Sequence, residues 1–84
     1  MHKRDTTTII LNGAAHPLED GQTVAELVSK QTGRQITAAG HAADGRRLGI
    51  AVARNAEIVP RGQWGTTVVM ADDVIEIVTA AQGG

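Results

Sequence analysis

The chain has no cysteine, no phenylalanine and no tyrosine, and it has a single tryptophan. Without cysteine it can form neither disulfides nor iron–sulfur clusters, and it offers no thiolate as a nucleophile or metal ligand. Eight basic residues stand against nine acidic ones, for a formal net charge of −1. This balance lacks the positive excess with which nucleic-acid-binding proteins neutralise phosphates, so no nucleic-acid partner is expected.

Long apolar runs are missing as well. No segment approaches the roughly 18 apolar residues of a membrane helix. The first eight residues, MHKRDTTT, lack the apolar centre of a signal peptide. We therefore expect no membrane association and a cytoplasmic location. The length of 84 residues predicts a single domain, residues 1–84, whose thin core leaves little room for an enclosed active site.

The patterns of catalytic and metal-binding sites are also absent from the sequence. The histidines His2, His16 and His41 have neither the i, i+4 spacing nor the carboxylate neighbours of a metal site. The adjacent Asp72 and Asp73 are explained by a tight turn, in which aspartate side chains bond to the backbone. No glycine-rich phosphate loop ending in Lys-Ser/Thr occurs. We therefore expect a protein that is not an enzyme and carries no metal or cofactor.

The N-terminal part of the chain has the pattern of a β-hairpin. Thr6–Leu11 is rich in β-branched residues and leads into Asn12-Gly13, a dipeptide strongly favoured in two-residue hairpin turns. A second strand, about Ala14–Leu18, is expected to pair back antiparallel to the first.

The next segment has the start and stop residues of one helix. Thr23 and Glu26 fit a capping box, in which each side chain satisfies a free amide of the first turn. Apolar residues follow at helical spacing, and Gly33 is placed for a left-handed C-terminal cap. The sequence therefore predicts one helix from Thr23 to Thr32.

The second half of the chain predicts short extended segments joined by turns. A long loop is expected over residues 34–49, with a short extended piece near Ile36. Pro60 is expected to end a strand, because it has no amide to donate, and to begin a tight turn or one 3₁₀ turn through Trp64. The predicted extended segments are Ile50–Ala53, Glu57–Val59, Thr66–Met70 and Val74–Ala80.

This order of elements predicts an α+β domain of the β-grasp type, in which one helix crosses a mixed sheet of four to five strands. We expect residues 1–5 to be frayed and residues 80–84 to form a flexible tail. The predicted core consists of apolar residues on one face of each element: Ile9, Leu11, Leu18, Val24, Leu27, Val28, Ile50, Val52, Ile58, Ile75 and Ile77.

Trp64, the only aromatic residue, has two interpretations. Packing at one end of the core is favoured about two to one over anchoring a partner, where tryptophan is over-represented. Both roles are compatible, and Trp64 and the nearby Arg61 are kept as candidate partner contacts.

The last residues form a run of small side chains, Ala80-Ala81-Gln82-Gly83-Gly84. A frayed terminus is one explanation. A functional one is that five extended residues reach about 17 Å, enough to enter a channel in a neighbouring protein. Glycines have no Cβ, so the carboxylate of Gly84 can approach a catalytic site through a narrow opening. A partner that adenylates this carboxylate would allow a sulfur nucleophile to displace AMP and leave a thiocarboxylate.

Several segments together resemble the ThiS family of thiamine-biosynthesis sulfur carriers. The similarity runs in order over residues 9–84, to the last residue of the chain. Its parts are Ile10-Leu11-Asn12-Gly13, the helix start Gln22–Val28, Ala51–Asn55, the Pro60-Arg61-x-x-Trp64 element, and Asp73–Ala80 followed by Gln82-Gly83-Gly84. The sequence departs from the family in a longer 34–49 stretch, and in Ala56 and Asp72 at turn positions where the family often has glycine.

The resemblance implies a ubiquitin-like β-grasp fold and a thiocarboxylate on Gly84, with Gln82 and Gly83 in the tail that enters the partner. It also implies two partners. One is an E1-like adenylyltransferase of the ThiF/MoeB type, which brings the ATP and Mg²⁺. The other is thiazole synthase, which receives the sulfur.

Alternatives remain open on the same fold. The closest is the MoaD-type small subunit of molybdopterin synthase, against which stand the absence of phenylalanine and the Pro60-Arg61-x-x-Trp64 element. A protein-conjugating ubiquitin-like modifier is another. A small RNA-binding β-grasp domain is disfavoured by the near-neutral charge and the lack of stacking aromatic residues.

Overall fold

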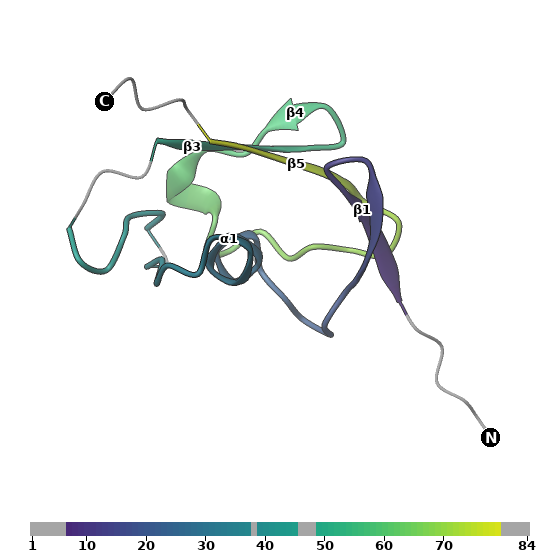
Figure 1. Ribbon diagram of the computed structural model, residues 1–84, viewed down its shortest axis with the longest axis horizontal. Helices are drawn as coiled ribbons and strands as arrows, with labels where there is room; N and C mark the ends of the chain where they lie inside the picture. The colour runs from purple at the N-terminus through teal and green to yellow at the C-terminus, as the bar shows by residue number, and fades with distance from the viewer. Residues whose placement is uncertain (1–6, 38, 46–48, 80–84) are drawn as a thin grey trace.

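The computed structural model describes residues 7–37, 39–45 and 49–79. Fraying of residues 1–5 and flexibility of residues 80–84 were both predicted, and both segments lie outside the described residues. The predicted α+β class is confirmed within them: one α-helix packs against one face of a five-stranded mixed sheet (Figure 1).

The sheet has the strand order β2-β1-β5-β3-β4, so the last strand of the chain lies in its centre. The β1–β2 hairpin turns at Asn12-Gly13, where both residues have positive φ, as predicted. β5 pairs in parallel with β1 and antiparallel with β3. The strands are β1 (Thr8–Leu11), β2 (Ala14–Pro17), β3 (Ile50–Arg54), β4 (Glu57–Ile58) and β5 (Val74–Thr79).

The helix α1 (Val24–Thr32) begins and ends as the sequence predicts. The Glu26 amide donates to Thr23 Oγ1 at 3.2 Å, and the Thr23 amide donates to Glu26 Oε1 at 3.0 Å, which completes the capping box. Gly33 ends the helix at φ 73°, and its amide donates to the Ser29 carbonyl. The entry to α1 is fixed in addition by a bridge between Thr23 and Val68, so the predicted extended segment 66–70 packs against the helix start.

The core lies between α1 and the sheet, and the prediction for it is wrong at Ile58. The antiparallel register places Ile58 opposite Ala53, on the face of the sheet that α1 does not cover, and Ile58 is 70% exposed. Val59, the next residue, is buried in its place. Trp64 and Val69 also belong to the core, whereas Leu18 and Ile77, both predicted, are partly buried at its edge. All other predicted core residues are buried.

Two turns use the left-handed backbone region without glycine. The β3–β4 turn has φ 52° at Asn55 and 71° at Ala56, and the turn before β5 has φ 68° at Asp72. Asparagine and aspartate tolerate this region because their short side chains bond locally, but alanine has no such compensation. Ala56 and Asp72 are the turn positions at which the sequence departs from the glycines of the family it resembles, and Ala56 is the strained one.

Replacing Ala56 by glycine is therefore expected to stabilise the fold. The left-handed conformation costs a residue with a Cβ about 1–2 kcal/mol, and glycine loses about 0.5–1 kcal/mol through chain entropy. The expected net gain in free energy of unfolding is about 0.5–1 kcal/mol, measured by urea denaturation. Ala51→Gly, in ordinary extended backbone on the exposed face of β3, is the matched control and should destabilise. Equal losses in both variants would contradict strain at Ala56.

Candidate functional site

The end of β5 is where the predicted tail leaves the sheet. Thr79, the last residue described, pairs with Ile50 at the start of β3, and Val78 pairs with Ala51. The predicted site residues Gln82, Gly83 and Gly84 lie outside the described residues. The site is thus defined by what holds the end of β5: the N-terminal hairpin on one side, and β3 with the turn after Pro60 on the other.

On one side, the side chain of Asn12 holds the β5 backbone. Its Oδ1 accepts from the Ile77 amide at 2.8 Å, and its Nδ2 donates to the Ile77 carbonyl at 3.3 Å. The Asn12 amide also donates to the Ile75 carbonyl. The side-chain amide therefore pairs with Ile77 as another strand residue would. The Asn12-Gly13 dipeptide was singled out for its turn, and nothing in the sequence pattern indicates this second role.

On the other side, Arg61 connects three parts of the molecule. Its Nη2 donates to the Ile50 carbonyl at 2.7 Å and its Nη1 to the Gly40 carbonyl at 3.2 Å. The guanidinium carbon lies 5.1 Å from the centre of the Trp64 ring, a cation–π contact. A Cβ on Gly40 would lie 2.5 Å from the Arg61 carbonyl oxygen, so only glycine fits there. Arg61 thus fixes the loop 39–45 and the start of β3.

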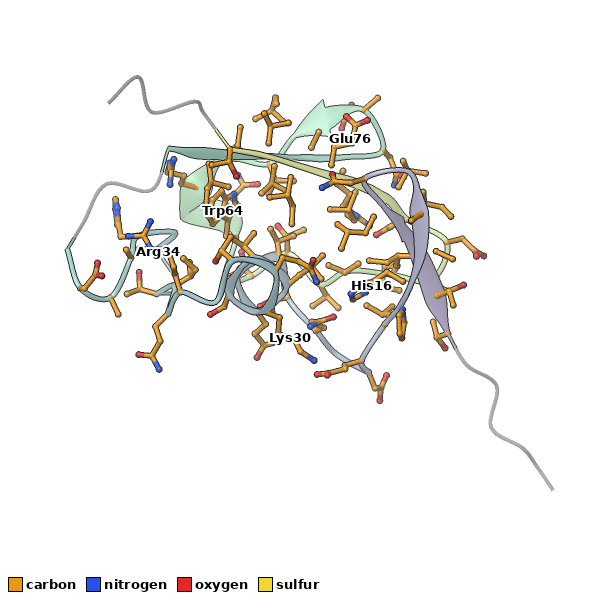
Figure 2. The ribbon with its side chains drawn as sticks, in the orientation of Figure 1. His16, Lys30, Arg34, Trp64 and Glu76 are labelled. Atoms are coloured by element: carbon orange, nitrogen blue, oxygen red, sulfur yellow. The ribbon has the colours of Figure 1, made fainter. Side chains whose placement is uncertain are left out.

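Trp64 lies between the sheet and α1 (Figure 2) and is fully buried. Its Nε1 donates to the Val59 carbonyl at 2.9 Å, and its own carbonyl accepts from the Ala25 amide of α1. The packing role favoured for Trp64 is the one observed. The Trp64 ring has no exposed surface in this conformation. Direct contacts of Trp64 and of the half-buried Arg61 with a partner stay predictions.

The sheet face opposite α1 is open and largely apolar. β5 presents Val74, Glu76 and Val78 on it, and Figure 2 shows Glu76 on the side away from the helix. The register brings three apolar side chains of neighbouring strands onto this face beside them: Ile10, Ala51 and Ile58. Val78 is 60% exposed and Ile58 70% exposed. We call Ile10, Ala51, Ile58, Val74 and Val78 the open apolar face; it extends to the point where the tail begins.

The start of β5 is held by the buried carboxylate of Asp73. This group accepts hydrogen bonds from Arg54 Nε at 2.7 Å, the Met70 amide at 2.8 Å and Asn55 Nδ2 at 3.0 Å. Burial alone raises the pKa of Asp73, but these hydrogen bonds and the charge of Arg54 outweigh it, and the pKa lies below its ordinary value. The predicted turn role of Asp73 is confirmed, and it extends to tying the β3–β4 turn to β5.

The described residues offer neither a metal site nor a membrane span. Nowhere in residues 7–37, 39–45 and 49–79 do three His, Asp or Glu side chains gather in a manner suited to a metal ion. Within the same ranges, no helix has the length and apolar character needed to cross a bilayer.

Comparison with known proteins agrees with this arrangement. The crystal structure of the thiamine biosynthesis protein ThiS from Geobacter metallireducens is similar, with a TM-score of 0.60 and 25% sequence identity. The alignment covers 92% of this chain and 99% of the other. No curated protein sequence gives a significant match.

One helix against a five-stranded mixed sheet with a central last strand defines a ubiquitin-like β-grasp domain, as predicted. The ThiS family model matches residues 9–84, nearly the whole chain. The chain therefore belongs to the ThiS family, and the resemblance stated from the sequence is confirmed.

Asp73 generates a prediction on acid stability. Its folded-state pKa is lowered, so its contribution is fully present above the ordinary value of 3.8 and is lost as the pH falls through the folded-state pKa. Asp73→Asn should lower the free energy of unfolding at pH 7 by about 2 kcal/mol. The difference between wild type and variant should shrink steadily below about pH 4.

Chemical denaturation between pH 3 and pH 7 measures this difference. The neighbouring Asp72 is exposed, and asparagine is equally tolerated at its positive φ, so Asp72→Asn is the matched control. It should change stability by less than about 0.5 kcal/mol. A loss for Asp73→Asn that is the same at every pH would contradict a charge-dependent role.

Proposed function

We propose that this protein is a sulfur carrier for thiazole formation in thiamine biosynthesis, and that it carries the sulfur as a thiocarboxylate on Gly84. The supporting observation is the family match, which continues past β5 through Gln82-Gly83-Gly84. Sulfur carriage needs only a stable domain and an accessible tail. In support, Thr79, the residue before the proposed tail, lies at the end of the central strand β5.

The chemistry proposed for Gly84 takes place in two steps on a partner enzyme. A carboxylate oxygen first attacks the α-phosphorus of ATP and displaces pyrophosphate, which gives an acyl adenylate. Hydrosulfide, or an equivalent sulfur donor, then attacks the carbonyl carbon, and AMP leaves with the oxygen that bridged carbon and phosphorus. A carboxylate is a poor acylating group and a mixed anhydride is a good one, so ATP activates the tail. The partner supplies ATP, Mg²⁺ and catalysis, and the carrier itself is not an enzyme.

The open apolar face is the surface proposed to dock the E1-like adenylyltransferase. It is continuous with the end of β5, so a partner bound there would receive the tail directly. Apolar side chains as exposed as Val78 and Ile58 are typical of interaction surfaces when they form a contiguous group. Thiazole synthase is the second proposed partner, and the ATP-dependent first step implies the cytoplasm as the place of reaction.

The alternative is a MoaD-type subunit of molybdopterin synthase, which would use the same Gly84 chemistry. The family match and the similar crystal structure both favour the thiamine pathway. The two proposals differ in the enzyme that accepts the sulfur and not in the carrier's own chemistry.

Intact-mass spectrometry tests the thiocarboxylate. After incubation with an E1-like adenylyltransferase, ATP and sulfide, the chain should gain the mass difference between one sulfur and one oxygen, located at Gly84 by peptide mapping. Deletion of Gly84 should abolish the gain and leave the thermal unfolding midpoint unchanged. Deletion of residues 2–5, at the other end of the chain, is the control and should retain it. Sulfur incorporation without Gly84 would refute the proposal.

A second arm of the same experiment tests the docking face. Val78→Lys places a charge on the open apolar face and should slow sulfur incorporation at least 10-fold at limiting partner, because a buried unpaired charge opposes docking. Val68→Lys is the matched control: Val68 is also apolar and 42% exposed, but lies beside Thr23 at the helix start. Equal rates in the two variants would exclude this face.

A further inference from the structure

The two central strands extend further toward the tail than their neighbours do. β1 pairs with β5 only at Val74 and Ile75, and β4 pairs with β3 only at Ala53 and Arg54. The Val52 carbonyl still accepts from the Val59 amide, so the part left with two strands is Ile50–Ala51 with Val78–Thr79, which projects from the sheet. Isolated two-stranded segments are marginally stable, because the outward backbone groups of both strands have no neighbouring strand to pair with. The segment from which the tail leaves therefore needs other support.

Asn12 supplies this support on the β5 edge. β1 ends at Leu11, and the next outward-facing backbone groups of β5 belong to Ile77. The Asn12 side chain bonds to both, the amide at 2.8 Å and the carbonyl at 3.3 Å. It thereby continues the β1–β5 ladder by one step after the β1 backbone has turned away at Gly13.

Arg61 supplies the equivalent support on the β3 edge. The Val52 carbonyl faces the β4 side and accepts from the Val59 amide. The Ile50 carbonyl, two residues earlier, faces the same side, but the chain has turned away at Pro60, and Arg61 Nη2 takes the place of a strand amide at 2.7 Å. The guanidinium is held in turn by the Trp64 ring and the Gly40 carbonyl.

We propose that Asn12 and Arg61 are positioning residues, which we call the end braces: each substitutes for a missing strand residue, and together they hold the end of the β3–β5 pair so that the tail is presented in one direction. Figure 1 shows the start of β3, the end of β5 and the 3₁₀ turn Arg61–Gln63 at the same end of the molecule. Neither side chain takes part in the chemistry. Their effect on sulfur loading rests on the proposed function.

The end braces act on recognition and not on the reacting carboxylate. Without them, the outward-facing backbone groups of Ile50 and Ile77 would hydrogen-bond to water, and the end of the β3–β5 pair would open more often. A partner would then have to order this segment during docking, which weakens binding without changing the reaction once the tail is in place. The expected result is a higher KM for the carrier with an unchanged kcat.

Amide hydrogen exchange tests the braces independently of the function. Asn12→Gly suits the positive φ of this position and removes only the side chain, and Arg61→Met keeps the length and removes the donors. Exchange of the Ala51 and Val78 amides, measured by NMR, should accelerate about 10-fold in each variant. The Ala53 and Glu76 amides, nearer the other end, should change less. Arg54→Met, which removes the arginine bonded to Asp73 at that end, is the matched control. It should accelerate exchange of the Ala53 and Glu76 amides more than that of the Ala51 and Val78 amides.

Kinetics of partner-catalysed adenylation tests the consequence. KM for Asn12→Gly and Arg61→Met should rise about 10-fold with kcat within about twofold, since one or two hydrogen bonds are lost. Arg54→Met should leave KM unchanged. Unchanged exchange of the Ala51 and Val78 amides would contradict the proposal that Asn12 and Arg61 support the strand end. Faster exchange without a rise in KM would contradict their role in presenting the tail. Should the wild-type chain accept no sulfur, the proposed function fails, and exchange alone decides on the braces.

Discussion

The pairing of β5 between β1 and β3 is the interaction on which the rest of the structure depends. β5 is the last strand in the chain, yet it lies in the centre of the sheet and joins the N-terminal hairpin to the second half. Its inward residue Ile75 is fully buried, so β5 contributes directly to the core. Only the last residues of β5, beyond the reach of β1 and β4, lack a second neighbouring strand, and it is there that side chains take over the support.

Side chains complete this sheet where its outer strands are too short. β4 has only two residues and β1 four, so the β3–β5 pair is longer than either neighbour. Asn12 and Arg61 bond to its tail end, and the Asp73 carboxylate with Arg54 and Asn55 joins its other end. Asn55 Oδ1 also accepts from the Val74 amide, so polar side chains bond to outward strand backbone at both ends. A domain of this size keeps its outer strands short and still has a well-defined central pair.

The sequence allowed most of the fold to be predicted, because its signals are local. The Asn12-Gly13 turn, the Thr23–Glu26 capping box and the β-branched β5 each specify an element through their own residues. Prediction failed at Ile58, because strand parity in a two-residue strand is set by its register with β3 and not by its own pattern. The burial of Val69 also depends on a contact distant in sequence, in this case between segment 66–70 and the start of the helix.

The candidate site could be predicted from the sequence only in part. The tail residues Gln82, Gly83 and Gly84 were predicted from composition and from the family resemblance; the family is confirmed, and the role of the tail stays a prediction. The supporting side chains were not found, since the bonds of Asn12 to Ile77 span 65 residues and no local pattern reports a contact of that range. Arg61 was recognised as part of a motif, but its bonds to Gly40 and Ile50 become visible only in three dimensions.

The most direct test of the account is the fate of the sulfur. The chain would be loaded with isotopically labelled sulfide, purified, and mixed in turn with thiazole synthase and its substrates and with the large subunit of molybdopterin synthase and its precursor. The account predicts that the label moves into the thiazole product while Gly84 returns to a carboxylate. A label that stays on the carrier with thiazole synthase but passes to the molybdopterin precursor would contradict it.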